Sequence, residues 1–167
     1  IGERFGQDRS TLRDTGEKTR AENLDHLIHE HGGPGTVISK LCHDIRMKFF
    51  ASLRMNNHYN TEESSPSFGR FRREHPELLI GRPDEQIPKF SQLWGLRTGK
   101  DFAYPQVRDF MASIAFELIE RFDIDGIELD FMRHPGVFRP EEAYANRYLL
   151  TDMVRQIRNR MDAIGQH

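Results

Sequence analysis

The sequence is short of the features that define several protein classes. Among its 167 residues there is one cysteine, Cys42, so no disulfide can form within the chain, and we expect this side chain to be a small core residue. No run of about 18 apolar residues occurs, so no transmembrane helix is predicted. The net charge is only -2, which excludes a strong bulk attraction to nucleic acid or to an anionic membrane. No signal peptide is visible, but the chain begins at Ile1 rather than Met, so the sequence assigns no compartment.

Several chemical motifs are also missing. No Gly-x-Ser-x-Gly nucleophile elbow occurs, and the glycine-rich segment 32–35 is not followed by the Gly-Lys-Ser/Thr of a phosphate-binding loop. His26, His29 and His31 lie near a predicted helix end, but the glutamate of a His-Glu-x-x-His zinc site is not there. We therefore predict no cofactor and no metal ion, and neither nucleic acid nor a membrane as a partner.

What the sequence does contain is an alternation of helical and extended patterns, which we interpret as one domain over residues 1–167. Hydrophobic residues make up 37% of the chain, enough to build a core. Strands that alternate with helices predict a parallel sheet with helical crossovers. In chain order, the pattern predicts a helix at 21–30, a helix after Thr36, a strand at 47–53, an extended segment within 90–96 or 100–104, a helix at 105–121, a strand at 123–132 and a helix at 140–163.

Residues 60–95 form a long stretch without clear periodicity. Loops of this length inside a domain are often functional. We predict a loop that acts as a lid or as a wall of a substrate site.

The stretch 122–135 is the most distinctive part of the chain. Ile127 and Leu129 share one face of the predicted strand, while Glu128 and Asp130 share the other. Two residues of extended strand separate these carboxylates by about 7 Å. Burying two acids without partners is costly, so we expect this face to border an opening to water. The ends of parallel strands are where α/β enzymes keep their active groups.

Other polar side chains follow the predicted strands. Arg54 ends the strand at 47–53 and is placed to oppose the two acids from a neighbouring strand. Trp94 and Tyr104 are candidate stacking platforms for a sugar ring, although such rings are also common in cores. The predicted substrate-binding residues are Arg54, Asn56, Asn57, His58, Asp101, Tyr104, Arg133 and His134.

Four segments of the chain carry a resemblance to a known family. Residues 49–57, 71–81, 102–109 and 125–135 resemble, in the same order, segments of the glycoside-hydrolase-like TIM-barrel proteins called family 10 glycosyl hydrolases. The resemblance implies a (β/α)₈ barrel that acts on, or binds, carbohydrate. A complete barrel needs roughly 250 residues. We therefore expect an α/β fold that is a partial TIM barrel, with strands 2 to 4 and their helices, as a fragment of a larger barrel.

The chain departs from the chitinase-type barrels at one point. Those proteins have Asp-x-Asp-x-Glu on their fourth strand, whereas Met132 stands here in place of the last acid, so that mechanism is not transferred. We expect Asp130 to be the general acid/base or nucleophile, with Glu128 one layer deeper. Because both acids project from one strand, the second catalytic acid is expected either on a strand outside this chain or at Asp101.

The leading hypothesis is a glycoside hydrolase that acts on a polysaccharide or oligosaccharide. One alternative is a partial barrel that binds carbohydrate without cleaving it, and another is a metal-dependent hydrolase that uses His58, His134 and either Glu128 or Asp130. A third is that Glu128, Asp130 and Arg54 form a buried structural ion network. Open sheet edges would allow the chain to associate with itself.

Overall fold

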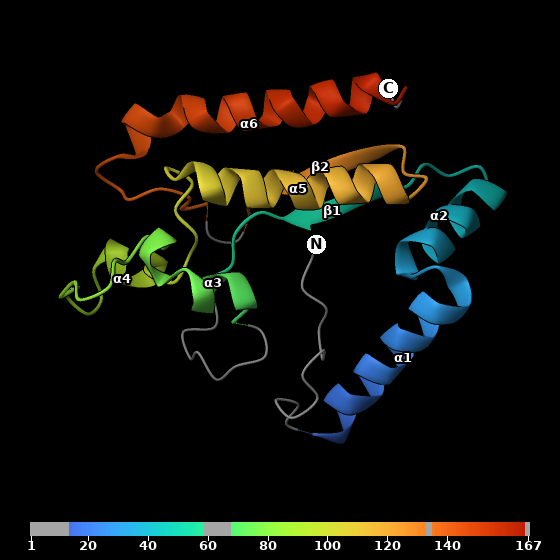
Figure 1. Cartoon of the computed structure of the whole chain (residues 1–167), viewed down its shortest axis with the longest axis horizontal. Helices are drawn as coiled ribbons and strands as arrows, with labels where there is room; N and C mark the ends of the chain where they lie inside the picture. Colours follow the sequence, from blue (N-terminus) through green and yellow to red (C-terminus); the bar gives the residue numbers. More distant parts are fainter. Residues whose placement is uncertain (1–13, 59–67, 133–134, 166–167) are drawn as a thin grey trace.

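The computed structural model describes residues 14–58, 68–132 and 135–165. Helices and two short strands follow one another along this part of the chain (Figure 1). The elements are α1 (Thr15–His31), α2 (Pro34–Asp44), β1 (Phe50–Arg54), α3 (Arg70–Glu74), the 3-10 helix η2 (Pro76–Leu78), α4 (Gln92–Leu96), α5 (Pro105–Arg121), β2 (Gly126–Asp130) and α6 (Ala143–Ala163).

The longer helices begin and end where local chemistry favours it. Helix α1 starts earlier than its apolar pattern predicts, because the Asp14 carboxylate caps it by accepting the Glu17 N–H at 2.8 Å. It ends at Gly32, whose φ of 76° lies in the left-handed region that glycine adopts without strain. Helix α5 starts at Pro105, whose missing N–H costs nothing in a first turn. No helix among the described residues is both long and apolar enough to cross a bilayer.

Strands β1 and β2 pair directly with each other as a two-stranded parallel sheet. Ser52 lies opposite Glu128 and Arg54 lies opposite Asp130. The Met55 N–H extends the ladder by donating to the Asp130 carbonyl at 3.0 Å. The connection between the strands passes through α5, as a parallel crossover requires.

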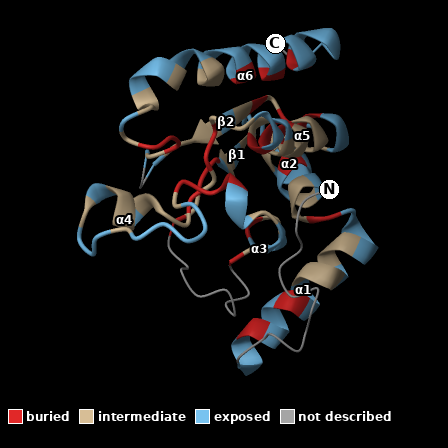
Figure 2. Cartoon of the chain, turned by 60° about the vertical axis from the view of Figure 1, so that its left-hand side comes forward, coloured by how far each residue is buried: buried red, intermediate tan, exposed pale blue. Residues whose placement is uncertain are grey.

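The two faces of the sheet differ in what covers them. Ala51, Leu53, Ile127 and Leu129 pack against the core that α5 and α6 supply. In Figure 2 the buried residues of α6 lie on its sheet-facing side. Most side chains of the opposite face are exposed, and Asp130 is partly covered; we call this the open face and define it by Phe50, Ser52, Arg54, Glu128 and Asp130.

The prediction of a partial TIM barrel with strands 2 to 4 is wrong. Because β1 and β2 are direct neighbours, no third strand lies between them. Residues 92–96 instead form helix α4, which Ser91 caps by accepting the Trp94 N–H at 3.1 Å. Lys100 makes only an isolated antiparallel bridge with Leu79.

The physical reason lies in how the backbone of 100–104 is satisfied. The Lys100 N–H donates to the Asn56 side chain at 3.0 Å, and the Phe102 N–H donates to the Val137 carbonyl at 2.8 Å. Ala103 donates to the Asp101 carboxylate at 3.0 Å. Because these backbone N–H groups already donate to side chains and to loop carbonyls, they are not available to pair with a neighbouring strand.

Helix α2 is fastened to the start of β2 by polar contacts. The Ser39 hydroxyl donates to the Asp123 carbonyl, and the His43 ring lies between two carboxylates. His43 Nε2 is 2.8 Å from Asp125 and Nδ1 is 3.2 Å from Asp123. The hydrogen bond to Asp125 raises the pKa of His43, and the Phe49 N–H and then His43 lower the pKa of Asp125. Cys42 nearby is a free thiol and only half-buried, so the prediction of a core residue is not fulfilled.

Replacing Phe102, which is 0% exposed, should test where the core lies. We expect Phe102→Ala to lower the free energy of unfolding by about 3–5 kcal/mol, because it leaves a cavity beside α5. Phe90 is 97% exposed, so Phe90→Ala is the matched control and should change the value by less than about 0.5 kcal/mol. Urea unfolding followed by circular dichroism measures both. Equal losses in the two variants would contradict this core.

The contact between α2 and β2 predicts a pH dependence. A histidine with a raised pKa stabilises the fold fully below its ordinary value of about 6.5, and this stabilisation is lost as the pH rises through the raised pKa. We therefore expect His43→Gln to lower the melting temperature at pH 6 and to have much less effect at pH 9. Thermal unfolding at a series of pH values measures this. A difference from wild type that is the same at both pH values would refute the ion pair.

Candidate functional site

The candidate site is centred on an ion pair across the two strands. Arg54 and Asp130 occupy opposite positions in the ladder, and Arg54 Nε is 2.7 Å from Asp130 Oδ2. The other oxygen, Oδ1, accepts the Met132 N–H at 2.8 Å. The Asp130 side chain is 17% exposed and the Arg54 side chain 49%, so water reaches the pair. Such an exposed pair contributes at most about 1 kcal/mol to stability, so its main effect is to fix the orientation of the carboxylate.

Glu128 precedes Asp130 by two residues on β2 and lies on the same open face. It is exposed, with exposed Ser52 directly opposite, and forms no ion pair within the part of the chain that the structure describes. Two residues of strand place the α carbons of Glu128 and Asp130 about 7 Å apart. The alternative of a buried network of Glu128, Asp130 and Arg54 does not match these exposures, since only Asp130 is substantially covered.

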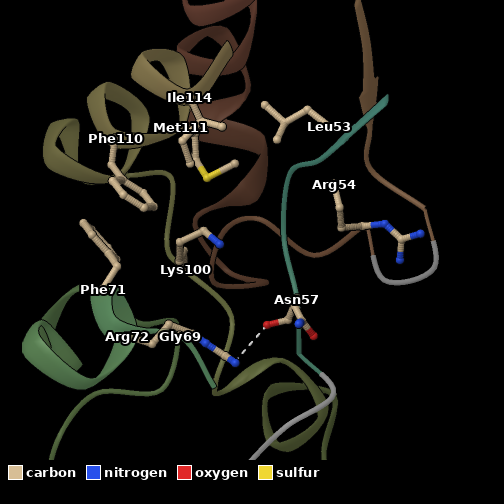
Figure 3. Close-up of a pocket in the computed structure, with 10 residues that line it drawn as sticks. All are labelled: Leu53, Arg54, Asn57, Gly69, Phe71, Arg72, Lys100, Phe110, Met111 and Ile114. Carbon is tan, nitrogen blue, oxygen red and sulfur yellow. Dashed lines mark hydrogen bonds between the residues drawn. The ribbon is translucent and has the colours of Figure 1, made fainter. Parts of the chain in front are cut away.

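A cavity of about 190 Å³ lies beside β1, between α3 and α5. Figure 3 shows Phe71, Phe110, Met111 and Ile114 on one side and Lys100 in the middle. Phe71 and Phe110 stack with ring centroids 4.2 Å apart. The cavity therefore has an apolar wall with a cationic group beside it.

The two predicted catalytic acids do not line this cavity. Its lining includes Leu53, Arg54, Asn57, Gly69 and Arg72 besides the residues just named. In Figure 3 the Arg54 side chain points away from the others, toward the chain that follows β2. Glu128 and Asp130 thus stand on an open surface, and the cavity lies along the edge of the neighbouring strand.

Asn56 and His58 were predicted to bind sugar, but the structure places both inside the loop that follows β1. The Asn56 amide donates to the carbonyls of Lys100 and Gly136, at 3.0 and 3.2 Å, and its oxygen accepts the N–H groups of Asn57 and Lys100. His58 is 5% exposed, and its Nδ1 is 3.3 Å from the Leu96 carbonyl. In this conformation both side chains hold neighbouring backbone in place.

Asn57 remains closer to a binding surface than Asn56 and His58. It is half-buried and lines the cavity beside β1, where its carbonyl accepts a hydrogen bond from Arg72 at 3.0 Å (Figure 3).

Asp101 and the two aromatic candidates are buried or partly covered. Asp101 is 0% exposed, and its Oδ2 has no hydrogen-bond partner in the described ranges. Tyr104 is the residue before α5 and is half-buried. Trp94 is covered on one side by the Arg97 guanidinium, 3.7 Å from the ring centroid. Arg133 and His134 lie outside the described residues.

Within the described residues, no cluster of side chains supports the prediction of a metal site. No group of three or more His, Cys, Asp or Glu side chains there is arranged to hold a metal ion. The predicted ligand His58 is turned toward the Leu96 carbonyl rather than toward the open face.

The sequence matches no family model, and it matches no curated protein sequence. The relation to glycoside-hydrolase-like barrels therefore stays a prediction that rests on the four segments themselves.

Sequence reasoning missed two partners at the site. Ser52 faces Glu128, and the Met132 N–H binds Asp130. Counting two residues back from the predicted Arg54–Asp130 contact would have identified Ser52. The Met132 contact is made by the backbone, which carries no signal in the residue type.

Asp101 supplies a test of the buried carboxyl. Burial raises its pKa, with a smaller contribution from Glu142, while the Ala103 N–H, Arg82 and Arg139 act in the opposite direction. An acid with a raised pKa favours the folded state fully below the unfolded value of about 3.9, and that stability is lost as the pH rises through the folded value.

We therefore expect Asp101→Asn to gain stability relative to wild type as the pH increases from 4 toward neutrality. Urea unfolding of both proteins across this pH range provides the measurement. If the free energies of unfolding of the two proteins changed with pH in the same way, burial of Asp101 would not raise its pKa.

Proposed function

We propose that this chain carries the catalytic carboxylates of a glycoside hydrolase, Asp130 and Glu128, on the open face. The observation that carries the proposal is the fixed Asp130 carboxylate, held by Arg54 at 2.7 Å, with an exposed second acid on the same face. Hydrolysis of a glycosidic bond ordinarily requires two carboxyl groups near the scissile bond. The resemblance of residues 49–57 and 125–135 to glycoside-hydrolase-like proteins supports carbohydrate as the substrate class.

The contacts suggest different roles for the two acids. Asp130 Oδ2 forms an ion pair with Arg54 and Oδ1 accepts the Met132 N–H, so the carboxylate is held in one orientation for a role as base. Glu128 is exposed and makes no described ion pair, so it is available to carry a proton to the leaving oxygen.

The reaction we propose is the inverting one, in which a general base activates water and a general acid protonates the leaving oxygen. The backbone positions of the two acids are about 7 Å apart along the strand. In this reaction Asp130 accepts a proton from water, the water oxygen bonds to the anomeric carbon, and the bond to the leaving oxygen breaks as Glu128 protonates it. A glycan lying along β2 would bring its scissile bond between the two groups.

A second candidate is carbohydrate binding without cleavage. It is favoured by one observation: neither acid lines the cavity beside β1, the cavity between β2 and α6 or the hollow beside α4, whereas enzymes usually enclose their substrate. The aromatic pair beside β1 would then supply a binding surface alone.

Replacement of Asp130 separates the two candidates. We expect Asp130→Asn to reduce sugar release from a susceptible glycan by about 10²- to 10⁴-fold, because general base catalysis is lost while the shape is kept. Asp152 on α6 is also a partly exposed acid paired with an arginine, so Asp152→Asn is the matched control and should retain full activity.

Release of reducing ends, together with circular dichroism of each variant, gives the measurement. Undiminished turnover by a folded Asp130→Asn protein would overturn the assignment. Saturable glycan binding by wild type without any bond cleavage would favour the binding function instead.

A further inference from the structure

A second hollow, of about 310 Å³, lies beside α4, away from the open face. Its volume is within the range of small-molecule sites, about 300–1,000 Å³. Both apolar and charged side chains line it: Phe68, Leu79, Gly81, Arg82, Glu85, Ile87, Trp94, Arg97 and Thr98. Figure 1 shows α4 at the end of the molecule opposite α1. We call this hollow the α4 pocket.

Backbone contacts on one side of the α4 pocket hold its walls together. The Gly81 N–H donates to the Arg97 carbonyl at 2.9 Å, and the Ile80 N–H donates to the Gly99 carbonyl at the same distance. A Cβ at Gly81 would lie 2.6 Å from the Arg97 Cβ, so the two segments approach as closely as glycine permits.

A buried arginine fixes the other side. Arg139 is 8% exposed and binds both oxygens of Glu85, at 2.7 and 2.9 Å, and the Ile80 carbonyl at 2.7 Å. This bidentate pair ties segment 80–85 to the chain before α6, which makes the pocket largely preformed.

The charges leave one cationic group without a carboxylate partner among the described residues. Glu85 is paired with Arg139, whose hydrogen bonds, with the Arg82 N–H, lower the pKa of Glu85 to about 2. Arg139 also binds Glu141 at 2.8 Å, so it is shared between two carboxylates. Arg82 is 3.5 Å from Glu142. No carboxylate in the described part of the chain lies within ion-pair distance of Arg97.

Arg97 is also held in position for binding. Its guanidinium lies over the Trp94 ring and donates to the Trp94 carbonyl at 2.5 Å, which leaves further N–H donors for a ligand. A guanidinium held in this way suits a carboxylate, which it can bind through paired hydrogen bonds.

The rest of the lining indicates what the carboxylate is attached to. Phe68 and Leu79 form the buried base of the pocket wall, and the half-buried Ile87 and Trp94 supply its accessible apolar surface close to the arginine. A sugar acid matches both features, since its ring has an apolar C–H face and its carboxylate is charged. We propose that the α4 pocket binds a hexuronate residue of an acidic glycan, with Arg97 on the carboxylate; the choice of a sugar rests on the proposed function.

The chain offers a direct reporter for this site, because Trp94 is its only tryptophan. Titration of the whole protein with a galacturonate trisaccharide should produce a saturable change in tryptophan fluorescence. A galactose trisaccharide of the same length and sodium acetate at the same ionic strength should produce none. Arg97→Gln should weaken binding about tenfold or more, as expected for loss of a charge-assisted hydrogen bond.

The controls separate this proposal from the catalytic one. Arg155→Gln removes an exposed arginine of α6 and should bind like wild type. If Arg97→Gln does not fold, Arg82→Gln at the pocket rim provides a second variant, with weaker binding expected.

The proposal fails if wild type shows no saturable change with the acidic trisaccharide. It also fails if the neutral sugar or acetate gives the same change, or if the arginine variants bind normally. Asp130-dependent cleavage of a neutral glycan without acidic-sugar binding would reject the α4 pocket site alone. Binding without cleavage of any glycan would reject the catalytic function alone.

Discussion

The direct pairing of β1 with β2 is the constraint on which the rest of this structure depends. In the observed register Arg54 lies opposite Asp130, so a guanidinium from one strand meets a carboxylate from the other. A strand between them would separate the pair by about 10 Å, which is twice the spacing of neighbouring strands. The same pairing turns the apolar residues of both strands toward α5 and α6 and leaves the acids on the open face.

A sheet of two strands also leaves an edge free on each side. Cavities flank the sheet on both sides: one lies beside β1 against α3 and α5, and the other lies between β2 and α6. The chain between the strands does not extend the sheet. It forms α3, η2, α4 and α5 with the loops between them, and Arg139, Asn56 and Arg72 donate hydrogen bonds to backbone carbonyls of these loops.

The elements with strong periodicity could be predicted from the sequence. The helix expected at 105–121 is found at Pro105–Arg121, and the strands expected at 47–53 and 123–132 contain β1 and β2. Alternation also placed Glu128 and Asp130 on one face correctly. The expected third strand failed because its apolar residues, among them Phe102, are buried by loop contacts rather than by a ladder. A short apolar run in the sequence does not indicate whether its side chains will be buried by loop contacts or within a sheet.

The roles of single polar residues were harder to predict for a related reason. Asn56 and His58 follow a strand, as ligand-binding residues often do, yet their hydrogen bonds go to backbone groups that are distant in sequence. No sequence pattern indicated a binding role for Arg97, because the position of its side chain depends on Trp94 and on the close approach of Gly81. Residue type shows that a side chain can form a hydrogen bond, but only the fold determines its partner.

Nuclear Overhauser effects between backbone protons test the strand pairing most directly. The observed register predicts contacts between the α proton of Arg54 and the amide proton of Asp130, and between Leu53 and the protons of residues 128–130. Regular contacts from β1 to residues 98–104, with none to residues 126–130, would contradict it, because a third strand would then separate Arg54 from Asp130.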